Sequence, residues 1–287
     1  MVDFQTLSLY HCPMTIVPIV TLEELDLQPY KTLRRPVEHQ RSGIFVAEGG
    51  KVVRRLLESR LDVISVLLTP EWLESYRPIL EPREEGTRVF VAPKQLVESI
   101  VGFHLHQGIM AIARIPQPAT LAAVLARTRS PLFLVAVDGL TNAENLGVLV
   151  RNCAAFSVDA LLVGETSSSP YLRRAVRNSM GAVFTLPVVH VPSLVDAIRQ
   201  MQSAHNVYVV AAHPHTEQKT LQETALQRDC CIVFGSEGEG ITPTVLAVCN
   251  ESVAIPMRKG VDSLNVASAS AVFLYEVQRQ RTRKADQ

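Results

Sequence analysis

Six short runs of apolar residues after position 130 constrain the fold more than any other feature of the sequence. Each run has the length of a strand, and a continuous apolar strand suits a parallel sheet that helices cover on both faces. The runs lie at 132–137, 160–163, 183–189, 207–212, 230–234 and 253–255. Segments with helical periodicity stand between or after them, at 145–156, 193–204 and 263–280. The sequence therefore predicts an α/β domain built on a parallel sheet.

The residues before this domain predict a second, smaller α/β domain. Its expected strands lie at 43–48, 63–68, 87–92 and 107–113, and an expected helix lies at 52–59. Prolines at 116, 118 and 131 surround one short segment rich in alanine and leucine, which places the domain boundary near 117. The start of the chain shows only an extended arm and one helical turn. The expected organisation is an extension at 1–28, a first domain at 29–117 and a second domain at 118–287.

Composition excludes several classes of protein. Apolar residues make up 47% of the 287 residues, which is enough for a sizeable core and excludes a chain that is disordered throughout. The 28 basic and 28 acidic residues balance, which excludes a highly basic coat protein and an acidic tail protein. No apolar run reaches 18 residues, and Asp3, Pro13 and Pro18 do not fit a signal peptide. We therefore expect a soluble cytoplasmic protein without membrane contact.

The spacing of cysteine and histidine predicts neither disulfides nor a metal site. The five cysteines include one adjacent pair and no CxxC motif, so we expect free, buried thiols. They stand at 12, 153, 230, 231 and 249. His104 and His106 have no cysteine or carboxylate at ligand spacing and are expected to be structural.

Basic residues gather near the start of the first expected domain. Residues 31–60 hold eight basic and three acidic side chains, a net charge of +5 within a neutral protein. Such a patch is typical of contacts with nucleic-acid phosphates, although a solvated helix face is an alternative interpretation. The arginines expected to contact phosphates are Arg34, Arg35, Arg41, Arg54 and Arg55. A second cluster consists of Arg173, Arg174 and Arg177.

Polar residues that directly follow the apolar runs are candidates for a site, because ligands of an open parallel sheet bind beyond the carboxyl ends of its strands. The first such junction spans 138–152. We expect Asn145 to cap the helix that follows and Gly147 to allow close approach of another backbone. Arg151 lies further along that helix. A capped helix with a solvated arginine is the alternative interpretation.

Two further junctions have the same character. Residues 234–243 combine three glycines with Glu237 and Glu239, and they lack both a Walker lysine and a GxGxxG motif. Free backbone N–H groups there suit an adenine edge or a ribose better than a triphosphate, and the alternative is a tight acidic turn. In the third junction, 255–268, Asp262 or Ser263 is expected to cap the last helix. A hydrogen bond to substrate is a second possible role for that serine.

Together, and in this order, the three junctions resemble the SpoU/TrmH family of RNA 2′-O-ribose methyltransferases, within the SPOUT class. The segments that match the family's three motifs are Asn145-x-Gly147-x-x-x-Arg151, 234–240 and 255–266. Residues 178–184 are similar to the segment that the family carries between its first two motifs. The resemblance covers residues 131–280. Upstream, 45–49 and 106–109 are similar to the family's N-terminal substrate-binding domain.

The resemblance implies an α/β fold in which the C-terminal SPOUT domain carries a parallel sheet and a deep trefoil knot that binds S-adenosylmethionine. Such a knot is an exception to the rule that chains are unknotted. The residues implied to bind the cofactor, largely through backbone groups, are Gly235, Gly238, Ile255, Met257 and Leu264. The small N-terminal α/β domain would bind the RNA substrate. A homodimer is also implied, although the apolar face of 263–280 suits a core role equally well.

The implied reaction is transfer of the sulfonium methyl group to a ribose hydroxyl of RNA; ribosomal RNA is favoured as the substrate, and tRNA stays open. The implied catalytic residues are Arg151, Asn145, Glu237, Ser263 and Asn265. A guanidinium is effectively always protonated. We therefore expect Arg151 to orient the hydroxyl or a flanking phosphate and to stabilise developing alkoxide charge, and the proton acceptor stays open.

Two other functions compete with this one. The first keeps the family and loses the activity: an RNA-binding protein with a degenerate cofactor pocket. The second is a nucleotide-dependent oxidoreductase on a doubly wound sheet. That function requires a glycine fingerprint followed by an acidic residue about 20 positions later, and neither Gly49-Gly50 nor 235–240 supplies it.

Overall fold

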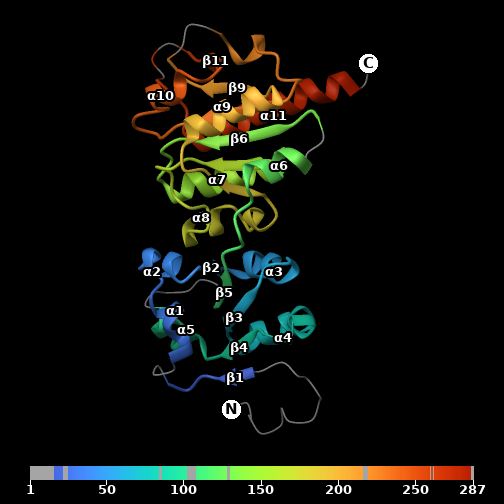
Figure 1. Cartoon of the computed structure of the whole chain (residues 1–287). Coiled ribbons are helices and arrows are strands. Elements are labelled where there is room, and N and C mark those ends of the chain that lie inside the picture. The colour runs from blue at the N-terminus through green and yellow to red at the C-terminus, as the bar shows by residue number, and fades with distance from the viewer. Residues whose placement is uncertain are drawn as a thin grey trace. The chain divides into compact units, whose positions relative to one another are not determined.

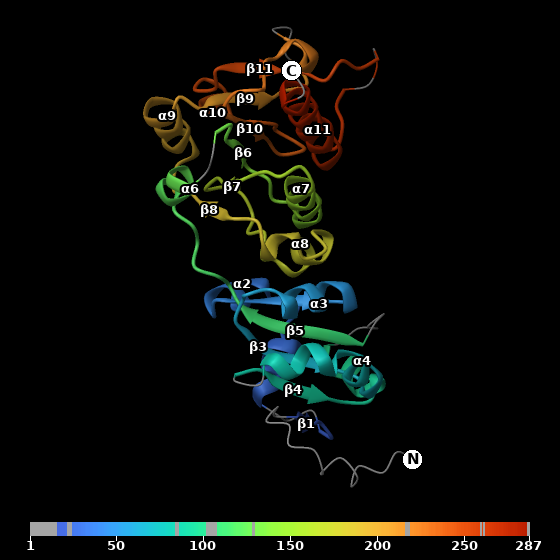
Figure 2. The same cartoon turned by 90° about the vertical axis from the view of Figure 1, so that its right-hand side faces the viewer.

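The chain forms two compact units, Met1–Pro116 and Gln117–Gln287 (Figures 1 and 2). This computed structural model describes residues 16–21, 25–83, 86–101, 108–127, 130–215, 219–258, 260 and 262–285. Cys12, His104 and His106 lie outside the described residues, so what the sequence predicts for them stays a prediction. Within the described residues, no helix is both long and apolar enough to cross a membrane.

The first unit is a five-stranded mixed sheet with the strand order β1-β4-β3-β5-β2. β1, β4 and β3 run parallel, and β5 is antiparallel to its neighbours β3 and β2. The strands are β1 (Ile16–Pro18), β2 (Ile44–Glu48), β3 (Val63–Leu68), β4 (Arg88–Val91) and β5 (Ile109–Arg114). The helices are η2 (Leu25–Leu27), α1 (Gln28–Lys31), α2 (Pro36–Arg41), α3 (Gly50–Glu58), α4 (Pro70–Leu80), η3 (Glu81–Arg83) and α5 (Lys94–Val101).

The described part of the expected N-terminal extension belongs to this unit. β1 adds a parallel edge strand beside β4, and Ile19 and Leu27 are 2% and 0% exposed in the core. The sequence predicted a separate arm here because a strand of three residues, ending at Pro18, is too short to show a period of two. This segment forms a strand because it pairs with β4, and the local sequence alone does not predict that strand.

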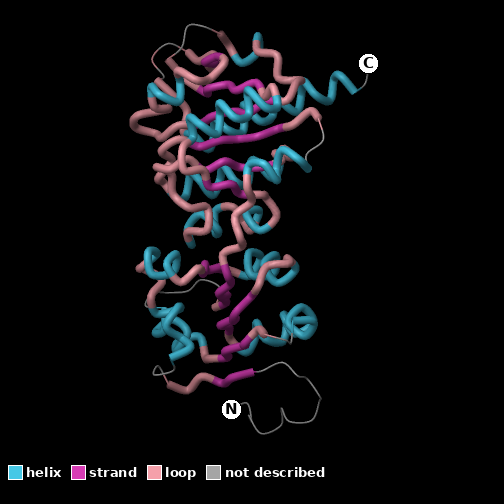
Figure 3. Tube along the Cα trace, viewed as in Figure 1, coloured by secondary structure: helices cyan, strands magenta, loops and turns pink. Residues whose placement is uncertain are grey.

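The second unit is a six-stranded, all-parallel sheet with the order β11-β9-β10-β6-β7-β8, which confirms the predicted parallel sheet. Figure 3 shows the strands in magenta and the helices in cyan. The strands are β6 (Phe133–Val137), β7 (Ala160–Val163), β8 (Val188–His190), β9 (Tyr208–Ala212), β10 (Cys230–Phe234) and β11 (Glu251–Val253). Every residue of the central strands β6 and β10 is buried. Helices therefore cover both faces, as the continuous apolar runs require.

Figure 2 shows α6 and α9 on one face of this sheet and α7 and α11 on the other. The helices are α6 (Leu121–Arg127), α7 (Ala143–Ala155), α8 (Arg173–Asn178), η4 (Ala182–Phe184), α9 (Leu194–His205), η5 (Leu221–Glu223), α10 (Pro243–Leu246) and α11 (Val266–Ala285). The predicted close approach at Gly147 is confirmed: a Cβ atom there would lie 2.5 Å from the carbonyl oxygen of Ala175. α7 and α8 therefore pack backbone to backbone.

Three expected boundaries in the second unit are wrong. The run 183–189 is not one strand, because Met180 and Gly181 have positive φ and start a turn that leads through η4; β8 begins only at Val188. The last strand ends at Val253 rather than 255, and α11 starts at Val266 rather than 263. Both shifts lengthen the irregular connection between β11 and α11.

That connection runs back across the sheet. β11 lies at the edge, outside β9 and β10, whereas the start of α11 is hydrogen-bonded to α7, the helix that follows β6. The described residues of this connection, 254–258, 260 and 262–265, therefore lead from the edge of the sheet back toward β6. A knotted connection needs a crossing of this kind, and the trefoil knot itself stays a prediction.

Candidate active site

Three segments that lie far apart in the sequence meet at the carboxyl ends of β6, β9 and β10. They are the loop from β6 to α7, the loop after β10, and the connection before α11. Parallel strands bring their carboxyl ends to one edge of a sheet, which is where a ligand site of such a sheet lies. These three segments are the ones in which the sequence analysis found its polar junctions.

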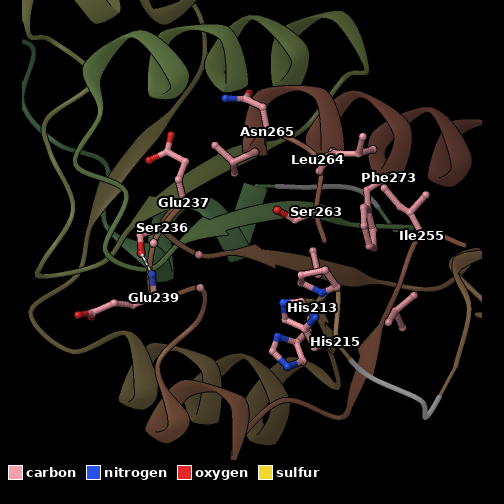
Figure 4. A pocket seen from close by; sticks show the side chains of 18 of the residues that line it. His213, His215, Ser236, Glu237, Glu239, Ile255, Ser263, Leu264, Asn265 and Phe273 are labelled. Atoms are coloured by element: carbon pink, nitrogen blue, oxygen red, sulfur yellow. Dashed lines mark hydrogen bonds between the residues drawn. The ribbon is translucent and has the colours of Figure 1, made fainter. Parts of the chain in front are cut away.

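A cavity of about 230 Å³ opens between the loop after β10 and the connection before α11 (Figure 4). All five residues predicted to bind the cofactor line it: Gly235, Gly238, Ile255, Met257 and Leu264. Three of the predicted catalytic residues, Glu237, Ser263 and Asn265, line it as well. Asn145 and Arg151, on α7, do not line the cavity.

A chain of hydrogen bonds joins the three motifs. Asn265 donates through Nδ2 to Oδ1 of Asn145 at 3.1 Å, and Asn145 donates through its own Nδ2 to Oε1 of Glu237. Asn265 also accepts the backbone N–H of Ala267 through Oδ1 at 2.9 Å. Each motif supplies one side chain, so this series of hydrogen bonds fixes the positions of the three segments relative to one another.

The two predicted helix caps are wrong. Asn142, not Asn145, caps α7, because its Oδ1 accepts the backbone N–H groups of Glu144 and Asn145 at 2.9 and 3.2 Å. At α11, Asn265 accepts a backbone N–H of the first turn, in the place expected for Asp262 or Ser263. A cap at Asn142 leaves the Asn145 side chain available to the other two motifs.

The loop after β10 is closed by a contact that only glycine permits. The backbone N–H of Ser236 donates to Gly240 O at 3.0 Å, and the Gly240 N–H donates back to Ser236 O at 3.2 Å. A Cβ atom on Gly235 would lie closer than 3.0 Å to the Gly240 carbonyl and to the amide of Ile241. Because Gly235 has no side chain, the loop can close in this way, and the closed loop forms one wall of the cavity.

Asp138, at the end of β6, holds the far end of the same loop. Its buried carboxylate accepts both the backbone N–H and the hydroxyl of Thr242, at 2.7 and 2.8 Å. The sequence analysis noted only that a strand ends there. An acidic residue buried at a strand end would have been a usable signal, because a buried carboxylate needs donors.

We expect Asp138→Ala to lower the free energy of unfolding by about 1–3 kcal/mol, since it removes the buried carboxylate that accepts both the backbone N–H and the hydroxyl of the half-buried Thr242. Urea denaturation followed by circular dichroism measures this effect. Asp262→Ala, which removes an exposed carboxylate of the connection before α11, is the matched control. Equal midpoints for the two variants would contradict the role given to Asp138.

Arg151 is exposed on α7, one turn beyond Gly147. Within the described part of the chain, no hydrogen-bond or ion-pair partner restrains its guanidinium. The adjacent Asn152, which the sequence analysis missed, donates to Ala267 O at 2.8 Å and to Ser270 Oγ at 2.9 Å. These bonds fix α7 to α11 and so set the position from which the arginine extends.

The sequence analysis also missed one wall of the cavity. His213 and His215 follow β9 and line the cavity together with Phe273 of α11. Burial lowers the pKa of His213, and the neighbouring His215 lowers it further. The rule that polar residues after an apolar run mark a site applies to β9 as well as to the other strands, and would have identified both histidines.

The thiols of the second unit take no part in this site. All four described cysteines are free. Burial raises the pKa of Cys230 to about 11 and that of Cys249 to about 12, so neither forms a thiolate nucleophile near neutral pH. The described residues contain no cluster of three or more histidine, cysteine or acidic side chains able to hold a metal ion.

Comparison with known proteins identifies the family. The sequence model of the SpoU rRNA methylase family matches residues 132–275. An uncharacterized tRNA/rRNA methyltransferase of Mycobacterium tuberculosis is 33% identical over 247 residues, 85% of this chain and 83% of that protein. The 23S rRNA (guanosine-2′-O-)-methyltransferase RlmB of Yersinia pestis is 35% identical over 210 residues, 72% and 84% of the two chains.

A solved structure shares the fold. The crystal structure of an AdoMet-bound rRNA methyltransferase from Sinorhizobium meliloti superposes with a TM-score of 0.79 at 21% identity, over 92% of this chain and 98% of that one. The family model covers half of the chain, including all three motifs, and each relative matches more than two-thirds of it. The chain therefore belongs to the SpoU rRNA methylase family.

Proposed function

We propose that this protein transfers a methyl group from S-adenosylmethionine to a ribose 2′-hydroxyl of RNA, in the cytoplasm. The observation that carries the proposal is the hydrogen-bond chain that ties the three motifs together beside one cavity. Ribosomal RNA is the proposed substrate, because the relatives named above include a 23S rRNA methyltransferase.

The cavity fits the cofactor. Val253, Ile255, Leu264 and Phe273 give it apolar walls suited to an adenine ring, and the absence of a side chain at Gly235 brings backbone groups to its surface. Within the described residues that line it there is no lysine or arginine to repel a cation. When bound, the cofactor supplies a methyl group made electrophilic by its positive sulfur.

The protein's own task is then to position the hydroxyl and to stabilise charge as its proton leaves. Arg151 has no hydrogen-bond or ion-pair partner among the residues that the structure describes, and it extends from a helix that Asn152 holds in place. Its permanent charge suits a flanking phosphate and the oxygen that becomes negative during transfer. Ser263 lines the cavity and can donate a hydrogen bond to the substrate, while the proton itself passes to water or to a substrate phosphate.

A methyl-transfer assay tests this function directly. Purified protein, tritiated cofactor and either ribosomal RNA or tRNA are combined, and nucleosides from the digested RNA are identified by mass spectrometry. We expect a 2′-O-methylated nucleoside from ribosomal RNA. The alternative, an inactive RNA-binding member of the family, predicts RNA binding without any affinity for the cofactor in calorimetry.

We propose the basic residues of the first unit as contacts to RNA phosphates. Arg35 is 69% exposed and paired with Glu38 at 3.1 Å, and Arg54 is paired with Glu58 at 3.6 Å on α3. Exposed pairs of this kind contribute little to stability, so their arginines can exchange partners for phosphate. The proposed set is Arg34, Arg35, Arg41, Arg54 and Arg55.

Replacing Arg34, Arg35 and Arg41 together by glutamine should weaken RNA binding and reduce the slope of log affinity against log salt by about 2–3, one for each lost phosphate contact. Filter binding over a range of salt concentrations measures the slope. Arg199→Gln, on α9 and 64% exposed, is the matched control. A triple variant with the wild-type slope would show that these side chains are only a solvated helix face.

We also propose a homodimer through the outer face of α11. Val272 and Tyr275 are 40% and 58% exposed there, and the ring of Phe156 at the end of α7 packs edge-on against Tyr275 at 6.4 Å. The buried side of α11, with Phe273, Leu274 and Val277, serves the core. The helix thus has two apolar faces, and only one of them is covered within the described residues.

We expect Tyr275→Glu to convert a dimer to a monomer, because a carboxylate on this face would be buried without a partner. Sedimentation velocity measures the change. Val37→Glu, at an apolar residue on α2 that is 55% exposed, should leave the dimer intact. A Tyr275 variant that sediments as wild type would place the interface elsewhere.

A further inference from the structure

The cofactor cavity has an unusual balance of charge. Its described lining includes two acidic side chains, Glu237 and Glu239 on the loop after β10, and two imidazoles, His213 and His215 after β9. The neighbouring charged residues Arg258 and Asp262 belong to the connection before α11 but do not line the cavity. The two imidazoles are therefore its only source of positive charge within the described residues.

The histidine pair has a defined position. The backbone N–H of His213 donates to Val253 O at 3.0 Å, which continues the β9–β11 pairing by one residue and fixes His213 at the cavity wall. The rings of His213 and His215 lie 6.1 Å apart and nearly perpendicular. Figure 4 shows both imidazoles together on one side of the cavity, with Glu237 and Asn265 on another.

The histidines and glutamates that line the cavity determine the electrostatic potential at a bound ligand. Burial, and then the neighbouring imidazole, lower the pKa of His213, so this side chain is neutral near pH 7 and gains a proton only in acid. Near neutral pH the cavity lining then presents carboxylates without a compensating cation. Protonation of His213 in acid supplies a cation on the side of the cavity away from Glu237.

The two ligands of a methyltransferase differ in charge. S-adenosylmethionine carries a sulfonium, an ammonium and a carboxylate, whereas the product S-adenosylhomocysteine has a neutral thioether in place of the sulfonium. The donor therefore carries one more positive charge than the product, and a cavity lined by carboxylates attracts the donor more strongly. Additional positive charge on the wall reduces that difference.

We propose that His213 and His215 are specificity-determining residues of this cavity. While His213 is neutral, Glu237 and Glu239 are uncompensated, and the cavity prefers the cationic donor to the uncharged product. A proton on His213 removes this preference, and the ring of His215, 6.1 Å away, acts through its position beside His213. The proposal rests on the proposed function, because it presumes that the donor binds in the cavity.

Isothermal titration calorimetry of the full chain with S-adenosylmethionine and with S-adenosylhomocysteine, at pH 7.5 and pH 5.5, tests the proposal. We expect the ratio of the two affinities to favour the donor at pH 7.5 and to fall by roughly threefold to tenfold at pH 5.5. In the double variant His213→Asn, His215→Asn the ratio should not change with pH. A structural role alone would alter both affinities together and leave their ratio unchanged.

His190→Asn is the matched control. This histidine ends β8, its pKa is also lowered by burial, and it does not line the cavity. It should behave as wild type. The single variant His215→Lys, at an exposed position, keeps the test valid where the double variant does not fold, and it should reduce the preference for the donor already at pH 7.5.

Two results would overturn the proposal: a wild-type ratio that is the same at both pH values, or a double variant that retains the wild-type dependence on pH. Failure of the proposed function has a different signature, since neither ligand would then bind at pH 7.5. The two failures are distinguishable in the same experiment.

Discussion

Replacing Arg151 by alanine should lower the rate of methyl transfer by about 100-fold or more and leave the affinity for S-adenosylmethionine unchanged. Removing a donor that stabilises developing negative charge has an effect of this size. The affinity should not change, because Arg151 does not line the cavity. Nor does the side chain hold any described part of the fold together, so the variant should fold normally.

Single-turnover assays with saturating cofactor measure the rate, and calorimetry measures the affinity. Arg199→Ala, at another exposed arginine, on α9, should retain full activity. Arg151→Lys should recover only part of the lost rate, because an ammonium lacks the planar pair of donors that a phosphate or alkoxide site uses. Wild-type turnover by Arg151→Ala, alongside an inactive Asn145→Ala, would assign the catalytic role to the asparagine instead.

Replacing Gly235 by alanine should lower the affinity for S-adenosylmethionine by about 100-fold or more. The added methyl group would overlap the Gly240 carbonyl and the Ile241 amide, which are backbone atoms that cannot rotate away. The pair of hydrogen bonds between Ser236 and Gly240 must then break. Accommodating the methyl group against these backbone atoms costs about 1–3 kcal/mol or more. The loop must open to do so, and the cavity then loses one wall.

Gly238→Ala gives a comparison within the same loop in which the fold of the loop is kept, so that any loss of affinity there reports contact with the cofactor alone. A Cβ atom on Gly238 would have no neighbour within 4 Å, and the backbone of this residue does not require glycine. Calorimetry with both variants, together with thermal melting to verify the fold, separates loss of the cavity from loss of stability. Indistinguishable cofactor affinities for the two variants would mean that the tight loop does not shape the binding site.

Much of the second unit could be predicted because its signal is local. The apolar runs that form β6, β7, β9 and β10 are buried on both faces, so each run marks a strand without knowledge of its neighbours. The run at 183–189 failed because a turn at positive φ interrupts it. Apolar character alone cannot distinguish a strand from a buried 3₁₀ turn.

The site was predicted where its residues lie in the matched motifs. The positions that depended on the fold were missed. Asn142 and Asn145 are equally good caps by residue type, and only the backbone decides between them. His213 is different, because it directly follows β9 and the rule used for the other strands would have identified it. Asn152 could not be found from sequence, since its partners Ala267 and Ser270 belong to a distant helix.

A crystal structure of the protein with S-adenosylmethionine tests the central claim most directly, which is that three distant loops build one cofactor site beside Arg151. The account predicts density for the cofactor between the loop after β10 and the connection before α11, with its methyl group on the side of the guanidinium. Density in another part of the molecule, or a methyl group that points away from Arg151, would contradict it.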